Sequence, residues 1–342
     1  MSGFSRAKAL VLSLSLVGAG LLGGCSGSGG SAVNLGYFPN LTHAPALVGL
    51  DQGFFAKALG DATLNTVTFN AGPSAIEALN AGSVDITFIG PNPTITGFTA
   101  SDGQALRVIA GAAANGAALV VADGITDAAG LAGKKIATPQ LGNTQDVALR
   151  YWLSEQGYET NTEGGGDVSI MPQDNGTALQ AFITGEIDGA WVPEPWATRM
   201  VLEGGGHVLV DEATIWPGGK FIVTNVIVRT EFLEQHPEQV EAVLTGLLDS
   251  LDYIEQNPAE SKAIVNKSIE AITGSGMDDA VLDSAWGNVV FTYDPLAATL
   301  RESAAHATAV GLLEEADLTG LYALDPLNKL LAARGLPEVT DE

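Results

Sequence analysis

The chain has 342 residues, of which 46% are hydrophobic, and its 15 Lys and Arg residues face 40 Asp and Glu. The formal net charge of −25 at pH 7 makes nucleic acid and anionic membrane surfaces poor partners, because like charges repel. The chain holds one cysteine, which excludes a disulfide within the chain and a thiolate metal site. The length is sufficient for two sizeable hydrophobic cores.

Two basic residues near the N-terminus precede an apolar run over 9–22, which leads into the letters LGGC ending at Cys25. This order of charge, apolar run and small residues is typical of a secretory signal with a bacterial lipoprotein cleavage site. The alternative, a transmembrane anchor, needs a longer apolar run. We therefore expect a signal peptide over 1–24, and a lipidated Cys25 with a flexible tether over 25–32. The mature protein would then be held at the outer face of the cytoplasmic membrane by its lipid alone.

The next part of the chain alternates strand and helix patterns. The spacing predicts strands over 33–37 and 63–69, separated by a loop and an apolar helix that runs through Phe55. Thr42 stands where it could cap this helix, and Pro45 suits its first turn.

The stretch over 72–92, GPSAIEALNAGSVDITFIGPN, organises the rest of the chain. Its letters GPS are typical of a helix start, and the alternation over 84–88 predicts a strand that leads into a second helix start at GPN. Two helix N-termini would then emerge at one edge of a β-layer with free backbone N–H groups. Such an edge binds small anionic or polar molecules.

The same unit recurs later in the chain. LQAFITGEIDGAWVPEP, which begins at Leu179, aligns with IEALNAGSVDITFIGPN at a constant shift of 103 residues, so that Asp85 meets Asp188 and Phe88 meets Trp191. A chance echo in an Ala- and Gly-rich chain is the alternative. The period is too long for a solenoid. It predicts two related α/β lobes whose loop edges face each other across a cleft.

These patterns divide the mature chain into a first lobe over 33–121, a second lobe over 122–224, and a return to the first lobe over 225–342. A strand over 221–228 is expected to lead back to the first lobe, and the chain after it shows helical patterns without a strand and therefore needs a sheet to pack against. Two crossings, near 121 and 225, would form a hinge. The expected fold class is α/β with two lobes, a cleft between them, and a helical C-terminal tail packed on the first lobe.

The loops at the predicted edges hold neutral polar groups and no Arg or Lys. Neutral donors at helix starts suit a hydrogen-bonded oxyanion such as a sulfonate, although each residue could instead cap its own helix. The candidate ligand-binding residues are Asn40, Thr42, His43, Gly72, Ser74, Gly90, Asn92, Asn143, Thr144, Gln145, Trp191 and Glu194.

Three of these candidates carry a specific expectation. Asn143, with Asp146 three residues later, resembles a helix capping box. Glu194 would repel an anion, so it either points to solvent or meets a cationic end of the ligand. Trp191 could wall an apolar or cationic part of the ligand, or it could belong to the core.

Enzyme signatures are sparse. The sequence contains no G-x-S-x-G, H-E-x-x-H or G-x-x-x-x-G-K-[ST] pattern, and no G-x-G-x-x-G after a predicted strand. The four histidines lack the spacing of metal ligands, and His43 alone lies in a predicted cleft loop. We therefore expect no catalytic residues, no metal and no cofactor.

Four segments carry a resemblance to a known family: GYFPNLTHAPALVGLDQGFF, FNAGPSAIEALNAGSVDITFIGPNP, LAGKKIATPQLGNTQDVALRYWL and DGAWVPEPW. They are similar to the pocket-forming segments of type II periplasmic solute-binding proteins of ABC importers, in the NMT1- and SsuA-like group for nitrate, sulfonates and taurine. The resemblance covers roughly 33–250. It implies a two-lobe clamshell that closes on a ligand and then docks on a membrane permease with its ATPase. It also implies pocket donors at Ser74, Asn92, Asn143 and Thr144, with Asn40, Thr42 and His43 on the opening loop.

We expect a monomeric, exported, lipid-anchored binding protein whose ligand is an alkanesulfonate or a taurine-like anion. Nitrate, bicarbonate, or a pyrimidine precursor of thiamine stacked on Trp191 are alternatives within the same class. From another class, the alternative is an enzyme that resembles thiamine-pyrimidine synthases and uses a pyridoxal cofactor, against which the export signal and lipid anchor argue. A surface sensor is a third possibility.

Overall fold

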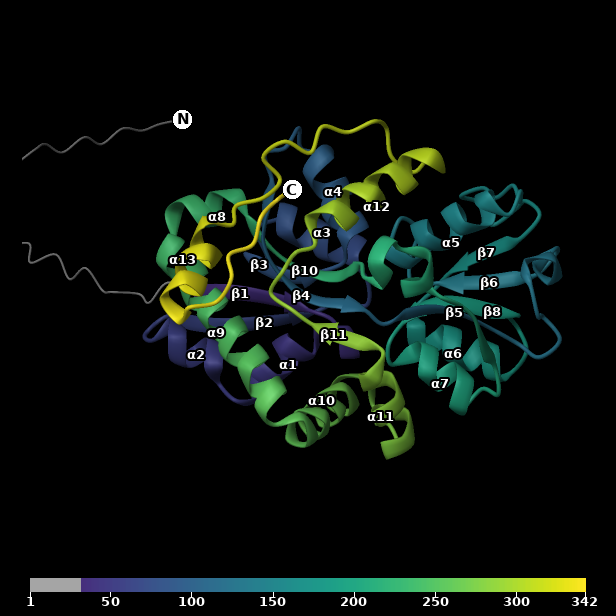
Figure 1. Ribbon diagram of the computed structural model, residues 1–342, viewed down its shortest axis with the longest axis horizontal. Coiled ribbons are helices and arrows are strands. Elements are labelled where there is room, and N and C mark those ends of the chain that lie inside the picture. Colours follow the sequence, from purple (N-terminus) through teal and green to yellow (C-terminus); the bar gives the residue numbers. More distant parts are fainter. Residues whose placement is uncertain (1–31) are drawn as a thin grey trace, which may run out of the picture. The chain divides into compact units, whose positions relative to one another are not determined.

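Two β-sheets, each covered by helices, form the core of residues 32–342, the part of the chain that the computed structural model describes (Figure 1). The first sheet has the strand order β11-β4-β10-β3-β1-β2, and the second has the order β7-β6-β8-β5-β9. We call each sheet with its covering helices a lobe. The expected signal peptide, Cys25 and all but the last residue of the tether lie outside the described residues.

The first lobe begins with parallel pairing of β1 with β2 and β3, and β10 then runs antiparallel between β3 and β4. Its strands are β1 (Ala32–Tyr37), β2 (Thr63–Thr68), β3 (Ile86–Ile89), β4 (Leu106–Asn115), β10 (Ile222–Arg229) and β11 (Val289–Phe291). The helices of its first half are η1 (Leu41–His43), α1 (Ala44–Asp51), α2 (Phe54–Leu59), α3 (Gly72–Asn80) and α4 (Pro91–Thr99).

The second lobe repeats this plan. Its strands are β5 (Ala117–Val121), β6 (Lys135–Thr138), β7 (Ser169–Pro172), β8 (Gly189–Pro193) and β9 (His207–Asp211). Its helices, with those of the returning connection, are η2 (Ala128–Leu131), α5 (Thr144–Glu155), α6 (Asn175–Ile183), α7 (Trp196–Leu202), η3 (Glu212–Ile215) and η4 (Pro217–Gly219).

The predicted internal repeat is visible in both sheets. The order β2-β1-β3-β10-β4 of the first corresponds to β7-β6-β8-β5-β9 of the second, with the same parallel and antiparallel pairings around β3 and β8. The matched aspartates explain part of the sequence likeness. Asp85 Oδ2 accepts the backbone N–H of Asn34 at 3.0 Å, and Asp188 Oδ2 accepts that of Lys135 at 2.9 Å. Each carboxylate thereby joins two neighbouring strands of its own sheet.

The chain first passes between the sheets at Gly116, where β4 ends in the first sheet and β5 begins in the second. Gly116 has φ 75°, a left-handed conformation that suits glycine. The segment 117–121, expected in the first lobe, therefore belongs to the second sheet, where β5 pairs with β8 and β9. The sequence shows the strand but not its distant partners, which decide the sheet. The chain returns between β9 and β10, close to the expected position.

The C-terminal tail packs on the first lobe as predicted, but it is not wholly helical. Its short strand β11 pairs with β4 at the sheet edge; three residues are too few to show an alternating pattern. The tail helices are α8 (Thr230–Gln235), α9 (Pro237–Gln256), α10 (Pro258–Thr273), α11 (Asp279–Gly287), α12 (Ala297–Ala309) and α13 (Asp325–Arg334).

The first sheet is buried on both faces. One face packs with α1, α2, α9 and α10 through residues such as Val226 and Leu244, while the other packs with α3, α4 and α12 through residues such as Ile227 and Leu300 (Figure 1). The alternation of Val226 and Ile227 on β10 sends successive side chains to opposite cores. Within residues 32–342, none of the helices combines the length and apolarity needed to cross a bilayer.

Three predicted helix caps are wrong. Thr42 lies inside η1, and α1 begins at Ala44 after His43. Ser74 lies inside α3, which begins at Gly72, so its hydroxyl does not cap that helix. Asn143 precedes α5 as expected, but its side chain makes no capping bond.

The Asp146 carboxylate does not complete a capping box either. It accepts hydrogen bonds from Thr138 Oγ1 and the Gly142 N–H, each at 2.9 Å, and pairs with Arg150 at 2.9 Å. Both charged side chains of this ion pair are almost fully buried. Asp146 therefore fixes the loop before α5 from within the second lobe.

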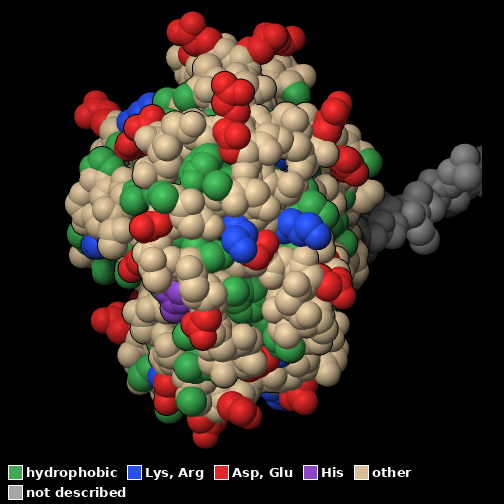
Figure 2. Space-filling model, turned by 90° about the vertical axis from the view of Figure 1, so that its right-hand side faces the viewer, with side chains coloured by type: hydrophobic (Ala, Val, Ile, Leu, Met, Phe, Trp, Pro, Cys, Tyr) green, Lys and Arg blue, Asp and Glu red, His purple; other side chains and the backbone are tan. Residues whose placement is uncertain are grey.

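The acidic composition is visible on the surface. Figure 2 shows the face on the side of the second sheet, where acidic side chains are scattered widely and the basic ones are few. Such a surface provides no broad attraction for an anion, so any anion-binding site must act through groups close to the ligand.

Candidate ligand-binding cleft

The loop edges of the two lobes face each other and enclose a small cavity. Its lining comes from both lobes, and seven of the twelve candidate residues belong to it: Asn40, Thr42, His43, Gly90, Asn143, Thr144 and Gln145. The enclosed space is about 20 Å³, which is room for a single water molecule. The lobes are therefore closed against each other, and a larger ligand requires the edges to separate.

Direct contacts hold the edges together around this cavity. The Leu41 N–H donates to the Glu194 backbone oxygen at 3.0 Å, and Trp196 Nε1 donates to Asn40 Oδ1 at 2.8 Å. Gly72 N–H donates to Asn143 Oδ1 at 3.3 Å. Each bond joins a residue of the first lobe to one of the second.

Gly90 is required for this approach. A Cβ atom at this position would lie 2.3 Å from Thr144 Oγ1, much closer than real side chains allow. Gly90, which follows β3, therefore leaves space for the first residue of α5, which comes from the other lobe.

Thr144 supplies a hydroxyl that is not used within the protein. The residue is 5% exposed, and its Oγ1 finds no hydrogen-bond partner among residues 32–342. Thr144 also opens α5, a helix of 12 residues whose first backbone N–H groups have no partner inside the helix. The positive end of the helix dipole and the free hydroxyl therefore meet at the cavity.

Asn175 is a cavity residue that the sequence interpretation missed. It is 4% exposed, and its Oδ1 also lacks a partner in the described part of the chain. Extending the internal alignment backwards at its constant shift pairs Asn175 with Gly72, so the repeat itself carried the signal. The other lining residues that were not predicted are Phe38, Asn70, Ala71, Pro139, Pro193 and Val223.

His43 is a neutral hydrogen-bond donor. Its Nδ1 accepts the Phe38 N–H at 3.3 Å, which places the ring proton on Nε2. Burial lowers its pKa from 6.5 to about 3, so the imidazole stays uncharged at physiological pH. The ring also stacks on Phe38, with 4.5 Å between the ring centroids.

Five candidate residues lie outside the cavity lining, and three of them belong to the first lobe. Gly72 uses its N–H on Asn143, as described above. Ser74 Oγ donates to Gln140 Oε1 at 3.4 Å, and Asn92 Nδ2 donates to the Ser303 oxygen of α12 at 3.1 Å. Asn92 is also the one residue among the first three of α4 with a backbone N–H, because prolines flank it. The start of α4 is therefore a weaker anion site than expected.

Trp191 belongs to the second-lobe core. It is fully buried, and its Nε1 donates to Glu212 Oε2 at 2.6 Å. Its ring packs edge-on against Trp152 at 6.1 Å. Of the two expectations for this residue, the core position is the one observed.

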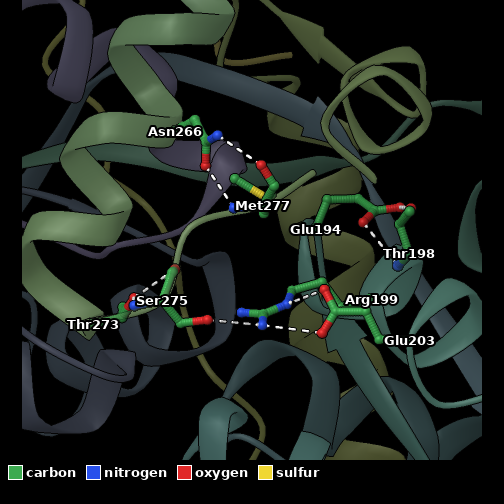
Figure 3. A network of polar contacts seen from close by, with 8 residues as sticks. All are labelled: Glu194, Thr198, Arg199, Glu203, Asn266, Thr273, Ser275 and Met277. Atoms are coloured by element: carbon green, nitrogen blue, oxygen red, sulfur yellow. Dashed lines mark hydrogen bonds and ion pairs between the residues drawn. The ribbon is translucent and has the colours of Figure 1, made fainter. Parts of the chain in front are cut away.

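Glu194 meets neither solvent nor a cation. It is 2% exposed, and its carboxylate accepts hydrogen bonds from Asn288 Nδ2 at 2.7 Å and from Thr198 Oγ1 at 2.9 Å (Figure 3 shows the Thr198 side). Burial raises its pKa, and these hydrogen bonds oppose that effect. Glu194 is among the residues that line a separate pocket of about 470 Å³.

A larger groove of about 600 Å³ adjoins the cavity and shares Asn40, Asn70 and Asn175 with it. It contains Arg199, whose guanidinium is bound to Glu203 at 2.9 Å. The cavity lining itself has no Lys or Arg among the described residues. The same residues, 32–342, contain no cluster of His, Cys, Asp and Glu that could hold a metal ion.

Comparison with known proteins identifies the family of this chain. The model of the NMT1-like family matches residues 27–269, most of the chain. The chain belongs to this family. Among its relatives, the taurine-binding periplasmic protein of Escherichia coli (strain K12) is 30% identical over 223 residues, which cover 64% of this chain and 66% of that protein. The match thus spans just under two thirds of that relative's length.

Solved structures show the same fold. The alkanesulfonate-binding protein SsuA from Xanthomonas axonopodis pv. citri, bound to MOPS, superposes with a TM-score of 0.69 at 20% identity, covering 83% of this chain and 95% of that one. The periplasmic nitrate-binding protein NrtA from Synechocystis PCC 6803 reaches a TM-score of 0.72 at 18% identity, covering 90% of each chain. At this identity the two structures establish the periplasmic binding protein fold with two lobes.

Proposed function

We propose that the protein is the extracytoplasmic substrate-binding component of an ABC importer. It binds a small sulfonate or taurine-like anion between its lobes and delivers it to the permease and its ATPase. It acts as a monomer, tethered to the membrane by lipid on Cys25, and it catalyses no reaction. The taurine-binding relative and the NMT1-like family membership support this class of protein.

The observation that carries the proposal is the pair of unsatisfied polar atoms in the cavity, Thr144 Oγ1 and Asn175 Oδ1. Leaving a buried polar group without a partner costs about 1–3 kcal/mol, so folded proteins keep few of them. Both atoms come from helix starts of the second lobe and face the edge of the first. A ligand between the lobes would satisfy both if it accepted from Thr144 Oγ1 and donated to Asn175 Oδ1, as the sulfonate and ammonium groups of taurine can.

The donor set favours an oxyanion held by hydrogen bonds. Thr144 Oγ1, the first N–H groups of α5 and the neutral Nε2–H of His43 can all donate to oxygen atoms. Because a sulfonate spreads its charge over three oxygens, several neutral donors can share it without a salt bridge. The acidic surface repels anions at long range, but screening limits this repulsion to about 8 Å at physiological salt.

The closed cavity makes lobe opening part of the mechanism. A space of about 20 Å³ does not admit taurine, so the ligand must bind an open form and be enclosed when the lobes close. We propose that the passages at Gly116 and before β10 form the hinge. The first lobe then comprises 33–115 and 222–342, and the second comprises 117–211.

The enzyme alternative lacks the residue that its chemistry needs. A pyridoxal cofactor is held through a Schiff base to lysine, and the described lining of the cavity offers no lysine. His43 is stacked, hydrogen-bonded and uncharged, which suits a binding role. An absorbance band of bound pyridoxal in the purified protein would reverse this preference.

Isothermal titration calorimetry tests the proposal with taurine, ethanesulfonate, nitrate, bicarbonate and a thiamine pyrimidine precursor. We expect one of the two sulfonates to bind, and Thr144→Val to weaken it about tenfold, because a charge-assisted hydrogen bond is lost. Thr96→Val, an exposed threonine on α4, is the matched control. If only nitrate or bicarbonate bound, the ligand would be an inorganic anion and the proposed sulfonate would be wrong. No binding of any of the five would refute the assignment.

A further inference from the structure

Helix α11 joins the two lobes at both of its ends. The helix belongs to the C-terminal tail, and it packs against α7 of the second lobe. Before its start, Ser275 Oγ accepts a hydrogen bond from Arg199 Nη2 at 3.0 Å. After its end, Asn288 Nδ2 donates to Glu194 Oε1 at 2.7 Å. We call α11 with Ser275 and Asn288 the α11 clasp.

The loop that presents Ser275 is fixed in place. The Asn266 side chain exchanges two hydrogen bonds with the backbone of Met277, each at 2.8 Å (Figure 3). Thr273 Oγ1 donates to the Ser275 backbone oxygen at 3.1 Å. The hydroxyl that meets Arg199 is therefore positioned by the tail itself before the second lobe contacts it.

Arg199, the partner of Ser275 in the second lobe, is also held in place. Arg199 is 6% exposed, and Glu203 binds its guanidinium through two contacts at 2.9 and 3.1 Å (Figure 3). The same guanidinium lies over the ring of Trp196 at 5.2 Å. Trp196 in turn donates to Asn40, a cavity residue of the first lobe. A continuous chain of contacts therefore leads from the clasp to the cavity wall.

The other end of the clasp lies beside the passage between the sheets. The Glu194 N–H donates to the Gly116 oxygen at 2.8 Å, and the Glu194 oxygen accepts the Leu41 N–H. With Thr198, Asn288 supplies the side-chain partners of this buried carboxylate. Separation of α11 from α7 would leave the carboxylate with one side-chain partner fewer, which disfavours opening.

We propose that the α11 clasp holds the lobes closed through contacts that do not involve the ligand, and that it thereby sets the rate of ligand release. This inference rests on the proposed function, because it takes lobe closure as the binding event. Any contact made only in the closed form shifts the equilibrium toward that form. Asn288 lies outside both the cavity lining and the adjoining groove, and Ser275 borders only the groove, so the bias arises from contacts between the lobes that lie outside the cavity.

Double electron–electron resonance measures the bias without a ligand. Spin labels at Asp61→Cys in the first lobe and Glu163→Cys in the second report the distance between the lobes, in a background with Cys25→Ser. We expect Ser275→Ala and Asn288→Ala each to increase the fraction of the longer distance severalfold, and the double variant to increase it further. Ser154→Ala is the matched control, because its hydroxyl bonds to Tyr151 within α5. Circular dichroism establishes that each variant is folded.

Distances in both single variants and in the double variant that equal those of Ser154→Ala would overturn the clasp. Stopped-flow release of taurine or ethanesulfonate gives the second readout: we expect severalfold faster release in the clasp variants. If neither sulfonate binds, the proposed ligand is refuted while the distance measurement still decides the clasp. If the sulfonates bind and the distances stay unchanged, the clasp alone is refuted.

Discussion

Glu212 offers the sharpest test of the structure, because it is a buried carboxylate where the chain returns from the second sheet to the first. Burial raises its pKa from 4.5 to about 7. Trp191 Nε1 at 2.6 Å and Trp216 Nε1 at 3.4 Å donate to its two oxygens, and these bonds lower the pKa by less than burial raises it. Replacing the carboxylate by an amide, Glu212→Gln, removes this titration while keeping the size of the side chain.

The sign of the effect follows from proton binding. The unfolded chain releases this proton near pH 4.5 and the folded chain near pH 7. Between these values the folded state binds more protons, so the contribution of Glu212 to the free energy of unfolding falls as the pH rises. A pKa difference of this size corresponds to about 3 kcal/mol of the free energy of unfolding, and this contribution is fully lost above pH 7.

Two histidines act in the opposite direction. Burial lowers the pKa of His43 to about 3 and that of His306 to about 4, from 6.5 in each case. The unfolded chain therefore takes up protons first as the pH falls below 6.5, and stability falls with it. The stability curve of the unmodified protein combines both trends, so the difference between it and the Glu212→Gln variant is the informative quantity.

Urea denaturation between pH 4.5 and pH 8, followed by circular dichroism, measures this difference. We expect the free energy of unfolding of the unmodified protein, relative to Glu212→Gln, to fall by about 3 kcal/mol across the range. The surface variant Glu186→Gln is the control for a glutamate change in the second lobe. A flat difference for Glu212→Gln would refute the raised pKa that burial gives this carboxylate.

Other substitutions test the cleft by calorimetry with the sulfonate that binds. Gly90→Ala should weaken affinity more than tenfold, because its Cβ would displace Thr144; unchanged affinity would contradict the closed geometry. Asn143→Ala should weaken affinity about fivefold, because a hydrogen bond between the lobes worth about 1 kcal/mol is lost. Ser74→Ala should leave affinity within twofold, since its hydroxyl lies outside the cavity and its bond across the lobes to Gln140 is long, at 3.4 Å. A large loss there would show that α3 contacts the ligand.

The elements that the sequence predicted well are those with long, regular patterns. The repeat around Asp85 and Asp188 predicted the two-lobe architecture, because similar strand and helix patterns occur twice in the sequence at a constant shift. The helical patterns of the C-terminal segment predicted its helices, of which α9 and α10 are the longest in the described part of the chain. Each of these signals is local, so one chain is enough to show it.

Features that depend on distant partners were not predictable in this way. The strand 117–121 has the same local pattern in either sheet, and its membership is decided by pairing with β8 and β9. Trp191 lies on β8, and its indole belongs to the core because of distant partners, the carboxylate of Glu212 and the ring of Trp152. Glu194 is likewise buried without a cation, because Asn288, which lies 94 residues later in the chain, donates a hydrogen bond to its carboxylate.

The same distinction separates the polar residues of the cleft into two roles. Asn40 and Asn143 were expected to contact the ligand, yet each uses its side-chain oxygen on the opposite lobe, at 2.8 Å from Trp196 Nε1 and 3.3 Å from the Gly72 N–H. Thr144 and Asn175 keep an unpartnered atom at the cavity. We therefore propose that closure and ligand contact depend on different side chains. Substitutions in the first pair should change affinity for all ligands alike, whereas those in the second should change the preference among them.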